Sequence, residues 1–202
     1  TACTRLLFAS TSEIYAGTLA HFDLTVPTPE HTPLALTALE SPRTSYRLSK
    51  IMGEAMVQQS GLPFTIFRPH NIYGPRMGMV HVIPEQLKKA FDAPSGDSIS
   101  VYSPDHKRAF CYVDDAIEML QRMLTCESCE GETLNLGTQA PEVTIREAVQ
   151  TCADVVGKAL TLEELPPTPG SPLRRAPDMH KTTQLLNFES QISLRSGIEK
   201  TW

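Results

Sequence analysis

The sequence predicts an α/β fold built on a doubly wound parallel sheet. Two compact apolar segments, at residues 5–10 and 64–68, are typical of buried strands. A helical apolar pattern lies between them, and helical and strand-like segments continue to alternate after the second one. This order is typical of parallel strands joined by crossover helices.

The first strand, residues 5–10, ends at the polar turn 11–13, and residues 21–44 form a proline-rich surface loop. A helix follows, ended by Gly61 and Pro63. The strand at 64–68 stops at Pro69 and runs into a loop at 70–76. The spacing i, i+3, i+4, i+7, i+8 predicts one buried helix face, formed by Leu48, Ile51, Met52, Ala55 and Met56.

The remaining elements follow the same reasoning. Residues 98–102 and 133–136 read as strands, and Val80, Ile83, Leu87 and Ala90 mark a helix. Thr144 and Glu147 have capping-box spacing and predict a helix that continues to about residue 157. Residues 163–176 form a proline-rich tail before a final helix at 193–202. Another helix, capped by Asp114 or a neighbour, is lined by Val113, Ile117, Leu120 and Leu124.

Charge and hydropathy exclude several classes of function. The 202 residues include 18 basic and 23 acidic side chains, a net charge of −5, and no basic run that would bind a phosphate backbone. No apolar stretch approaches the roughly 20 residues of a membrane-spanning helix. The first residues lack the pattern of a signal peptide. We therefore expect a cytoplasmic protein that binds neither nucleic acid nor membranes.

The five cysteines fit a reducing compartment, because their number is odd and their density is low. Cys126 and Cys129 have CxxC spacing. A structural zinc site needs a second ligand pair, however, and a redox motif needs a strand followed by a helix. Neither is visible, so the spacing is interpreted as chance in a loop. The six histidines are scattered, and no metal site is predicted.

Tyr46 and Lys50 are the strongest candidates for chemistry. Their i, i+4 spacing places both on one face of the predicted helix, beside its apolar stripe. An ammonium one helical turn from a phenol favours the phenolate, which is a base. The spacing alone is common by chance. It gains weight from a hydroxyl-rich turn after the preceding strand and from the loop after the following one.

Taken together, six segments resemble the extended short-chain dehydrogenase/reductase family, the NAD-dependent epimerases, dehydratases and decarboxylases of nucleotide sugars. The resemblance runs from about residue 5 to the end of the chain. It implies a Rossmann-type sheet with a small C-terminal substrate-binding lobe. The segments are LLFASTSEIY (6–15), SYRLSK (45–50), FRPHNIYGPR (67–76), KRAFCYVDD (107–115), ETLNLG (132–137) and RRAPD (174–178).

The resemblance implies a role for each candidate residue. Tyr46 is the catalytic base, and Lys50 favours its phenolate form and binds the nicotinamide ribose. The Thr11 hydroxyl contacts the same substrate oxygen as Tyr46, and Ser12 and Glu13 lie beside Thr11 as further catalytic residues. Ser10, Pro69 and His70 join Tyr46 and Lys50 in binding NAD. The substrate is bound by Asn71, Arg108, Arg175, Val101 and Tyr102, with the two arginines on the diphosphate, since planar guanidinium groups suit phosphate oxygens.

Several of these assignments have a structural alternative. The turn at 11–13 is also a plausible helix cap, and Asn71 a loop residue that tolerates an unusual dihedral angle. Arg108 and Arg175 have an alternative as ordinary surface cations. His70 is expected to make backbone or packing contacts and not to shuttle protons.

The sequence departs from the family in one respect. None of its eleven glycines forms the glycine-rich turn that cradles a pyrophosphate. The chain therefore resembles the C-terminal two-thirds of such an enzyme, and by itself it is expected to be inactive. Residues 1–78 and 107–137 belong to the NAD-binding domain, and 79–106 and 138–202 to the nucleotide-sugar lobe. The expected partners are an upstream Rossmann half and a second copy, bound through the Tyr46 helix.

Three reactions remain open. A UDP-hexuronate decarboxylase ranks first, because Thr11-Ser12-Glu13 and Arg108-Ala109-Phe110 resemble that group. A 4-epimerase ranks second, because its reaction has no obvious task for Glu13, a carboxylate beside the catalytic hydroxyl. A 4,6-dehydratase ranks third, because Ser12 is a poor proton donor where one dehydratase group has an aspartic acid. The non-enzymatic alternative is a fragment or subunit that only binds sugar nucleotide.

Overall fold

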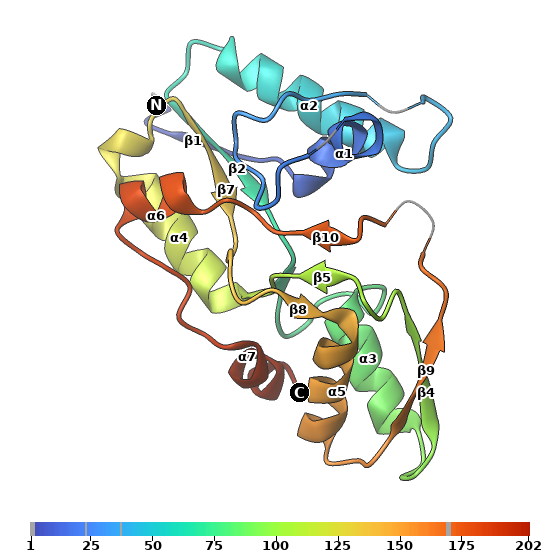
Figure 1. The fold of residues 1–202 in the computed structure, drawn as a ribbon. Coiled ribbons are helices and arrows are strands. Elements are labelled where there is room, and N and C mark those ends of the chain that lie inside the picture. The colour runs from blue at the N-terminus through green and yellow to red at the C-terminus, as the bar shows by residue number, and fades with distance from the viewer. Residues whose placement is uncertain (1–2, 23, 37, 169–170) are drawn as a thin grey trace.

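The computed structural model describes residues 3–22, 24–36, 38–168 and 171–202 (Figure 1). The predicted loop at 21–44 and the predicted tail at 163–176 include residues 23, 37, 169 and 170, which lie outside the described residues. Part of that tail forms strands: β9 (Thr161–Leu165) and β10 (Arg174–Arg175).

The centre of the molecule is a parallel sheet in the order β1-β2-β7. Its strands are β1 (Leu6–Ala9), β2 (Phe64–Pro69) and β7 (Glu132–Leu136). Figure 1 shows α1 (Ala16–His21) and α2 (Thr44–Gln58) on one side of this sheet, and α4 (Val113–Thr125) and α6 (His180–Leu186) on the other. The predicted α/β fold with parallel strands is therefore confirmed.

The prediction for the buried face of α2 is wrong. The side chains of Met52, Ala55 and Met56 are exposed, whereas Glu54 and Val57 are buried. The helix therefore turns a partly polar face toward the sheet and leaves most of its apolar stripe outside.

Two contacts explain this orientation. Gly53 lies against the ring of Phe8 on β1, so closely that any side chain there would collide with it. One residue further, the Glu54 carboxylate accepts hydrogen bonds from Arg68 of β2, from Nε at 2.9 Å and from Nη2 at 2.6 Å. Because a buried guanidinium needs a partner, this ion pair outweighs the burial of a methionine side chain.

The inward face of α4 also differs from the prediction. Ile117 and Leu124 are exposed, and the helix buries Asp115, Ala116, Met119 and Met123. Hydrogen bonds to a buried carboxylate again account for the orientation of the helix. Asp115 Oδ2 accepts them from Ser190 Oγ and from the backbone N–H groups of Gln191 and Ile192. The residue at the cap position is Tyr112, not Asp114.

A second group of elements forms the lower part of the molecule in Figure 1. The parallel pair of β4 (Ser98–Tyr102) and β9 lies beside α3 (Val82–Asp92) and α5 (Ile145–Val156). The strands β5 (Lys107–Arg108) and β8 (Val143–Thr144) form a small sheet with β10, in the order β10-β5-β8. The remaining elements are β3 (Ile72–Tyr73), β6 (Cys111–Tyr112), α7 (Leu194–Thr201) and the 3-10 helices η1 (Ser12–Tyr15) and η2 (Glu127–Cys129).

The capping box predicted at the start of α5 is confirmed. Glu147 N donates to Thr144 Oγ1 at 3.1 Å, and Thr144 N donates to Glu147 Oε2 at 2.7 Å. Replacing Thr144 with alanine leaves the N–H group of Glu147 without its acceptor. We expect the free energy of unfolding to fall by about 1 kcal/mol, measured by urea denaturation. An unchanged midpoint would show that water replaces the cap without cost.

Candidate functional site

The candidate residues gather where two neighbouring strands of the central sheet end. Ser10 to Glu13 follow β1, and His70 and Asn71 follow β2, which pairs with β1 in parallel. In parallel sheets the carboxyl ends of the strands form the edge at which ligands bind. The fold therefore brings these two segments to one edge.

Lys50 connects α2 to the end of β1. Its Nζ donates a hydrogen bond to the carbonyl oxygen of Ala9 at 2.8 Å and lies 5.8 Å from the ring centroid of Tyr46. Tyr46 is 38% exposed and lies outside the lining of the two cavities described below. The predicted unit of a phenol and an ammonium is thus assembled beside the strand end.

Thr11 acts as a cap, and its hydroxyl proton has no acceptor among the described residues. Its Oγ1 accepts a hydrogen bond from the backbone N–H of Glu13 at 3.2 Å and caps η1. A hydroxyl has two lone pairs and one proton, so this cap uses only an acceptor. The structural and the functional interpretation of Thr11 are therefore compatible. Beside it, the buried Ser10 Oγ has no hydrogen-bond partner within the described part of the chain.

Arg43 belongs to the site, and sequence reasoning missed it. Its Nε and Nη2 donate to the two carboxylate oxygens of Glu13 at 2.7 and 2.5 Å, and these bonds raise the pKa of Arg43. Its guanidinium carbon lies 5.1 Å from the ring centroid of Tyr46. Its φ of 65° is a left-handed conformation that non-glycine residues rarely adopt. The available signal was its i, i+3 spacing to Tyr46.

Arg108 and Arg175 lie side by side, although they are far apart in sequence. Each belongs to a short strand, and the pairing of β5 with β10 makes them register partners. Arg108 is buried and Arg175 is partly buried, which argues against their being ordinary surface cations. Burial, and then the charge of Arg175, lower the pKa of Arg108 to about 10. Two like charges held together in this way form a receptor for an anion.

Asn71 positions Arg175. Its Oδ1 accepts from Arg175 Nη2 at 2.7 Å, and its Nδ2 donates to the carbonyl of Ala109 at 3.0 Å. Its φ of 43° is left-handed, which agrees with the structural alternative of a loop residue that tolerates an unusual dihedral angle. Asn71 therefore combines an unusual backbone conformation with specific hydrogen bonds of its side-chain amide.

His70 is held as a neutral imidazole. The Asn135 amide donates through Nδ2 to the carbonyls of Thr28 and Asp178, so its Oδ1 faces His70 Nε2 at 3.1 Å and accepts the ring proton. Burial, and then the charge of Arg175, lower the pKa of His70 to about 3. Near neutral pH this ring is uncharged.

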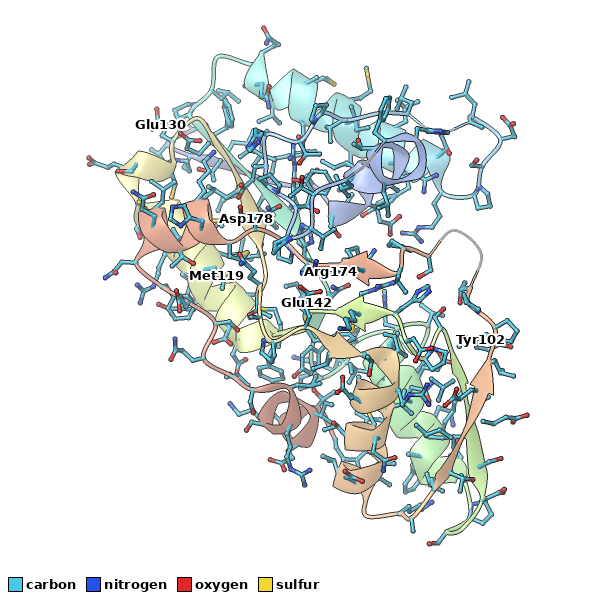
Figure 2. All side chains as sticks on the ribbon, viewed as in Figure 1. Tyr102, Met119, Glu130, Glu142, Arg174 and Asp178 are labelled. Carbon is cyan, nitrogen blue, oxygen red and sulfur yellow. The ribbon has the colours of Figure 1, made fainter. Side chains whose placement is uncertain are left out.

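A cavity of about 480 Å³ lies among η1, the start of α2 and residues 171–175. Ser12, Glu13 and His70 line it, together with five arginines. Figure 2 shows Arg174, one of the five, facing Glu142, whose carboxylate oxygens it binds at 2.7 and 2.5 Å. Among the described lining residues, Glu13 carries the one carboxylate. The arginines are Arg43, Arg47, Arg108, Arg174 and Arg175.

A second cavity, of about 300 Å³, shares Arg108, Ser171 and Arg175 with the first. Asn71 and the exposed side chain of Tyr102 also line it. Val101 lines neither cavity, because its side chain is fully buried in the core formed with Ile99, Ile145 and Val149. This places the Val101 side chain in the core and not at a ligand surface. Pro69, the last residue of β2, also lines neither cavity.

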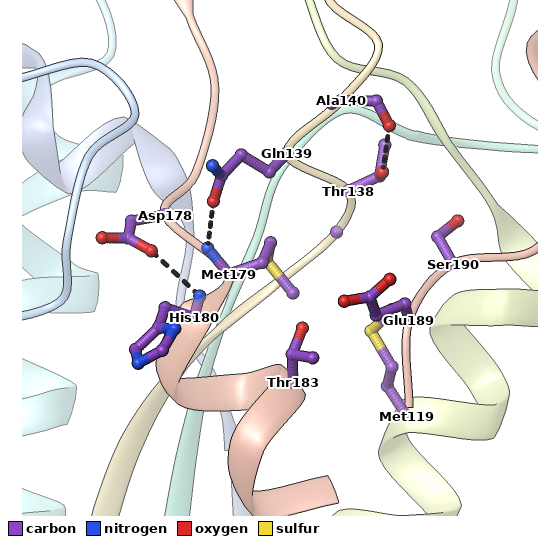
Figure 3. Close-up of a pocket in the computed structure, with 11 residues that line it drawn as sticks. Met119, Thr138, Gln139, Ala140, Asp178, Met179, His180, Thr183, Glu189 and Ser190 are labelled. Atoms are coloured by element: carbon purple, nitrogen blue, oxygen red, sulfur yellow. Dashed lines mark hydrogen bonds between the residues drawn. The ribbon is translucent and has the colours of Figure 1, made fainter. Parts of the chain in front are cut away.

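A further pocket of about 370 Å³ lies between α4, α6 and the segment after β7 (Figure 3). It shares no lining residue with the two cavities above. Several of its polar groups already have partners: Gln139 Oε1 accepts from Met179 N, and Asp178 Oδ1 accepts from His180 N. We therefore do not include it in the site.

The described residues show neither of two further kinds of feature. They contain no group of three or more histidine, cysteine, aspartate or glutamate side chains arranged to hold a metal ion. They also contain no helix with the length and apolar character needed to cross a membrane.

Comparisons with known proteins show which family and fold this chain is similar to. The family model for the NAD dependent epimerase/dehydratase family matches residues 1–137. UDP-glucuronic acid decarboxylase 5 of Arabidopsis thaliana is 29% identical over 96% of this chain and 55% of its own. UDP-N-acetyl-alpha-D-glucosaminuronate decarboxylase of Bacillus cytotoxicus is 30% identical over 98% of this chain and 62% of its own.

A similar solved structure is UDP-glucuronic acid 4-epimerase from Bacillus cereus, in complex with UDP-glucuronic acid and NAD. It has a TM-score of 0.77 and 23% identity, over 98% of this chain and 60% of the other. This likeness shows the fold. The chain spans little more than half the length of the plant relative.

Proposed function

Because the chain belongs to the NAD-dependent epimerase/dehydratase family, we propose that its protein modifies a nucleotide sugar through a 4-keto intermediate. More specifically, we propose decarboxylation of a UDP-hexuronate. The resemblance of Thr11-Ser12-Glu13 to decarboxylases supports this choice, as do the similar decarboxylases named above. Their own activities belong to longer chains, so the reaction is a proposal for the full gene product.

The position of Arg43 is the observation that favours a hexuronate as the substrate. A nucleoside diphosphate needs cationic partners, and Arg108 and Arg175 form such a pair on β5 and β10. Arg43 is a separate cation, at the N-cap of α2, with its guanidinium carbon 5.1 Å from the ring centroid of Tyr46. A neutral sugar has no use for it there, whereas the carboxylate of a hexuronate does. The planar guanidinium binds a carboxylate through two parallel hydrogen bonds, as it already binds Glu13.

The residues present fit the nicotinamide end of NAD. Lys50 and the exposed Tyr46 stand beside the end of β1, and the buried Ser10 hydroxyl has no partner among the described residues. These groups would hold the ribose and the amide. No glycine-rich turn in this sequence would hold the pyrophosphate. When bound, NAD+ accepts a hydride from C4 of the sugar and later returns it.

In this mechanism the chain's own residues handle protons and charge. Tyr46 removes the proton of the sugar 4-hydroxyl, with the Lys50 ammonium 5.8 Å from the centroid of its ring. The Thr11 hydroxyl, whose proton the cap leaves available, donates to the same oxygen as that oxygen becomes a ketone and then an enolate. The resulting β-keto acid loses carbon dioxide and leaves an enolate, which takes up a proton from solvent at C5 to give the 4-keto pentose that is then reduced at C4. Glu13 orients Arg43, which holds the carboxylate until it leaves.

The test uses the full gene product with NAD+ and UDP-glucuronate. We expect release of carbon dioxide and a UDP-pentose, detected by mass spectrometry. Glu13→Gln leaves Arg43 without its ionic partner and should lower carbon dioxide release about a hundredfold, the effect of misplacing a reacting group. Its effect on substrate binding should be smaller.

Other products would replace this proposal. A sugar nucleotide of unchanged mass with inverted C4 would establish the 4-epimerase, a reaction named for the Bacillus cereus structure. Loss of one water from a neutral UDP-hexose would establish the dehydratase. Binding of UDP-glucuronate without any turnover would support the non-enzymatic alternative.

A further inference from the structure

The function proposed above leaves Cys126 and Cys129 without a role. They lie in the connection between α4 and β7, where a loop was expected, and the structure instead forms the 3-10 helix η2 there. Cys129 N donates to the carbonyl of Cys126 at 3.2 Å. Cys126 is the N-cap of this helix and Cys129 is its last residue, so the two cysteines stand at the first and last positions of one hydrogen-bonded turn.

The distance between the two residues suits a disulfide. A turn closed by a backbone hydrogen bond between residues three apart holds its first and last Cα atoms within about 7 Å of each other. Disulfides join cysteines whose Cα atoms are roughly 4.4 to 6.8 Å apart. Burial, and then the neighbouring Cys126 side chain, raise the pKa of the Cys129 thiol to about 12.

The turn is fixed at both ends by hydrogen bonds from the central sheet. Arg5 Nη1, just before β1, donates to the carbonyl of Cys126 at 3.3 Å. Thr65 Oγ1, on β2, donates to the carbonyl of Cys129 at 2.6 Å. The two cysteines therefore keep their separation, and little backbone movement is needed to join their sulfur atoms.

The two thiols differ in access to solvent. Cys126 is partly exposed, with its Sγ 3.6 Å from the carbonyl of Leu185, while Cys129 is fully buried. An oxidant in solution therefore meets Cys126 first. Cys129 is shielded from the oxidant but has Cys126 within reach. This asymmetry is suited to a reacting and a resolving thiol.

We propose that Cys126 and Cys129 are a redox modification site, which closes to an intramolecular disulfide by exchange with a small disulfide such as oxidised glutathione. The Cys126 thiolate attacks one sulfur of glutathione disulfide and releases one glutathione thiolate. Cys129, on losing its proton, then attacks the Cys126 sulfur of the mixed disulfide and releases the second glutathione. The protein loses two hydrogen atoms in total, and glutathione disulfide is reduced to two thiols.

The experiment uses a Cys3→Ser background, because Cys3 is exposed and would react independently. After incubation with glutathione disulfide, we expect the intact mass to fall by two hydrogen atoms, with residues 126 and 129 linked in a non-reducing peptide map. Cys129→Ala should instead keep one glutathione on Cys126. Cys152→Ala is the matched control: it removes another fully buried thiol and should still close.

A stable glutathione adduct on Cys126 in the chain that retains Cys129 would overturn the proposal, because the resolving step would then be absent. An unmodified Cys126 after prolonged incubation would overturn it as well. Circular dichroism of Cys129→Ala separates loss of chemistry from loss of fold. If that variant is unfolded, Cys129→Ser provides the same test with a smaller change in volume.

Discussion

Replacing Tyr46 with phenylalanine is expected to lower the turnover of the full gene product by about two to four orders of magnitude, the usual contribution of a positioned base. The change removes one oxygen atom and leaves the ring that stacks on Arg43 in place. Folding and nucleotide-sugar binding should therefore remain nearly unchanged. Stopped-flow turnover and calorimetric titration with UDP-glucuronate measure the two effects separately.

Tyr112→Phe is the matched control. Tyr112 lies on β6, and its ring is buried in the core against Tyr73, whereas Tyr46 is exposed. Turnover should be the same in this variant as in the parent protein. Full activity in Tyr46→Phe would mean that another group removes the proton, and the assignment of Tyr46 and Lys50 would be wrong.

Much of the fold was predictable because its signals are local. The strands at 98–102 and 132–136 and the capping box of Thr144 and Glu147 depend on residues close in sequence. The orientation of α2 was not predictable in this way. It depends on Arg68, a residue of the following strand that forms a buried ion pair with Glu54. Hydrophobic periodicity assigns Met52 to the core because it contains no information about such a pair.

The same distinction between local and long-range signals applies to the candidate site. Spacing alone places Tyr46 and Lys50 on one helix face, and the structure has them there. The pairing of Arg108 with Arg175 depends on two strands of two residues each, which are too short to be seen in a sequence. Arg43 was missed for another reason. Its left-handed backbone directs the guanidinium to Glu13, and no propensity predicts that conformation for arginine.

Replacing Glu54 with alanine is expected to lower the free energy of unfolding by about 3 to 5 kcal/mol. The side chains of Glu54 and Arg68 are each 5% exposed, so the substitution leaves a buried guanidinium without its carboxylate. Arg68 Nη1 keeps its bonds to the Tyr15 hydroxyl and the Glu30 carbonyl, but neither supplies a negative charge. Since small domains are stable by only about 5 to 15 kcal/mol, urea denaturation should show a large shift in midpoint.

The exposed pair of Glu132 and Lys181 provides the comparison. Both side chains are 39% exposed, and Glu132→Ala should cost at most about 1 kcal/mol because water solvates the remaining lysine. The double variant Glu54→Met and Arg68→Met should recover most of the stability lost in Glu54→Ala, since no buried charge is left unpaired. If Glu54→Ala proves no more costly than Glu132→Ala, Arg68 must reach solvent when its partner is removed. The ion pair would then not be what orients α2, and the exposed position of Met52 and Met56 would need another cause.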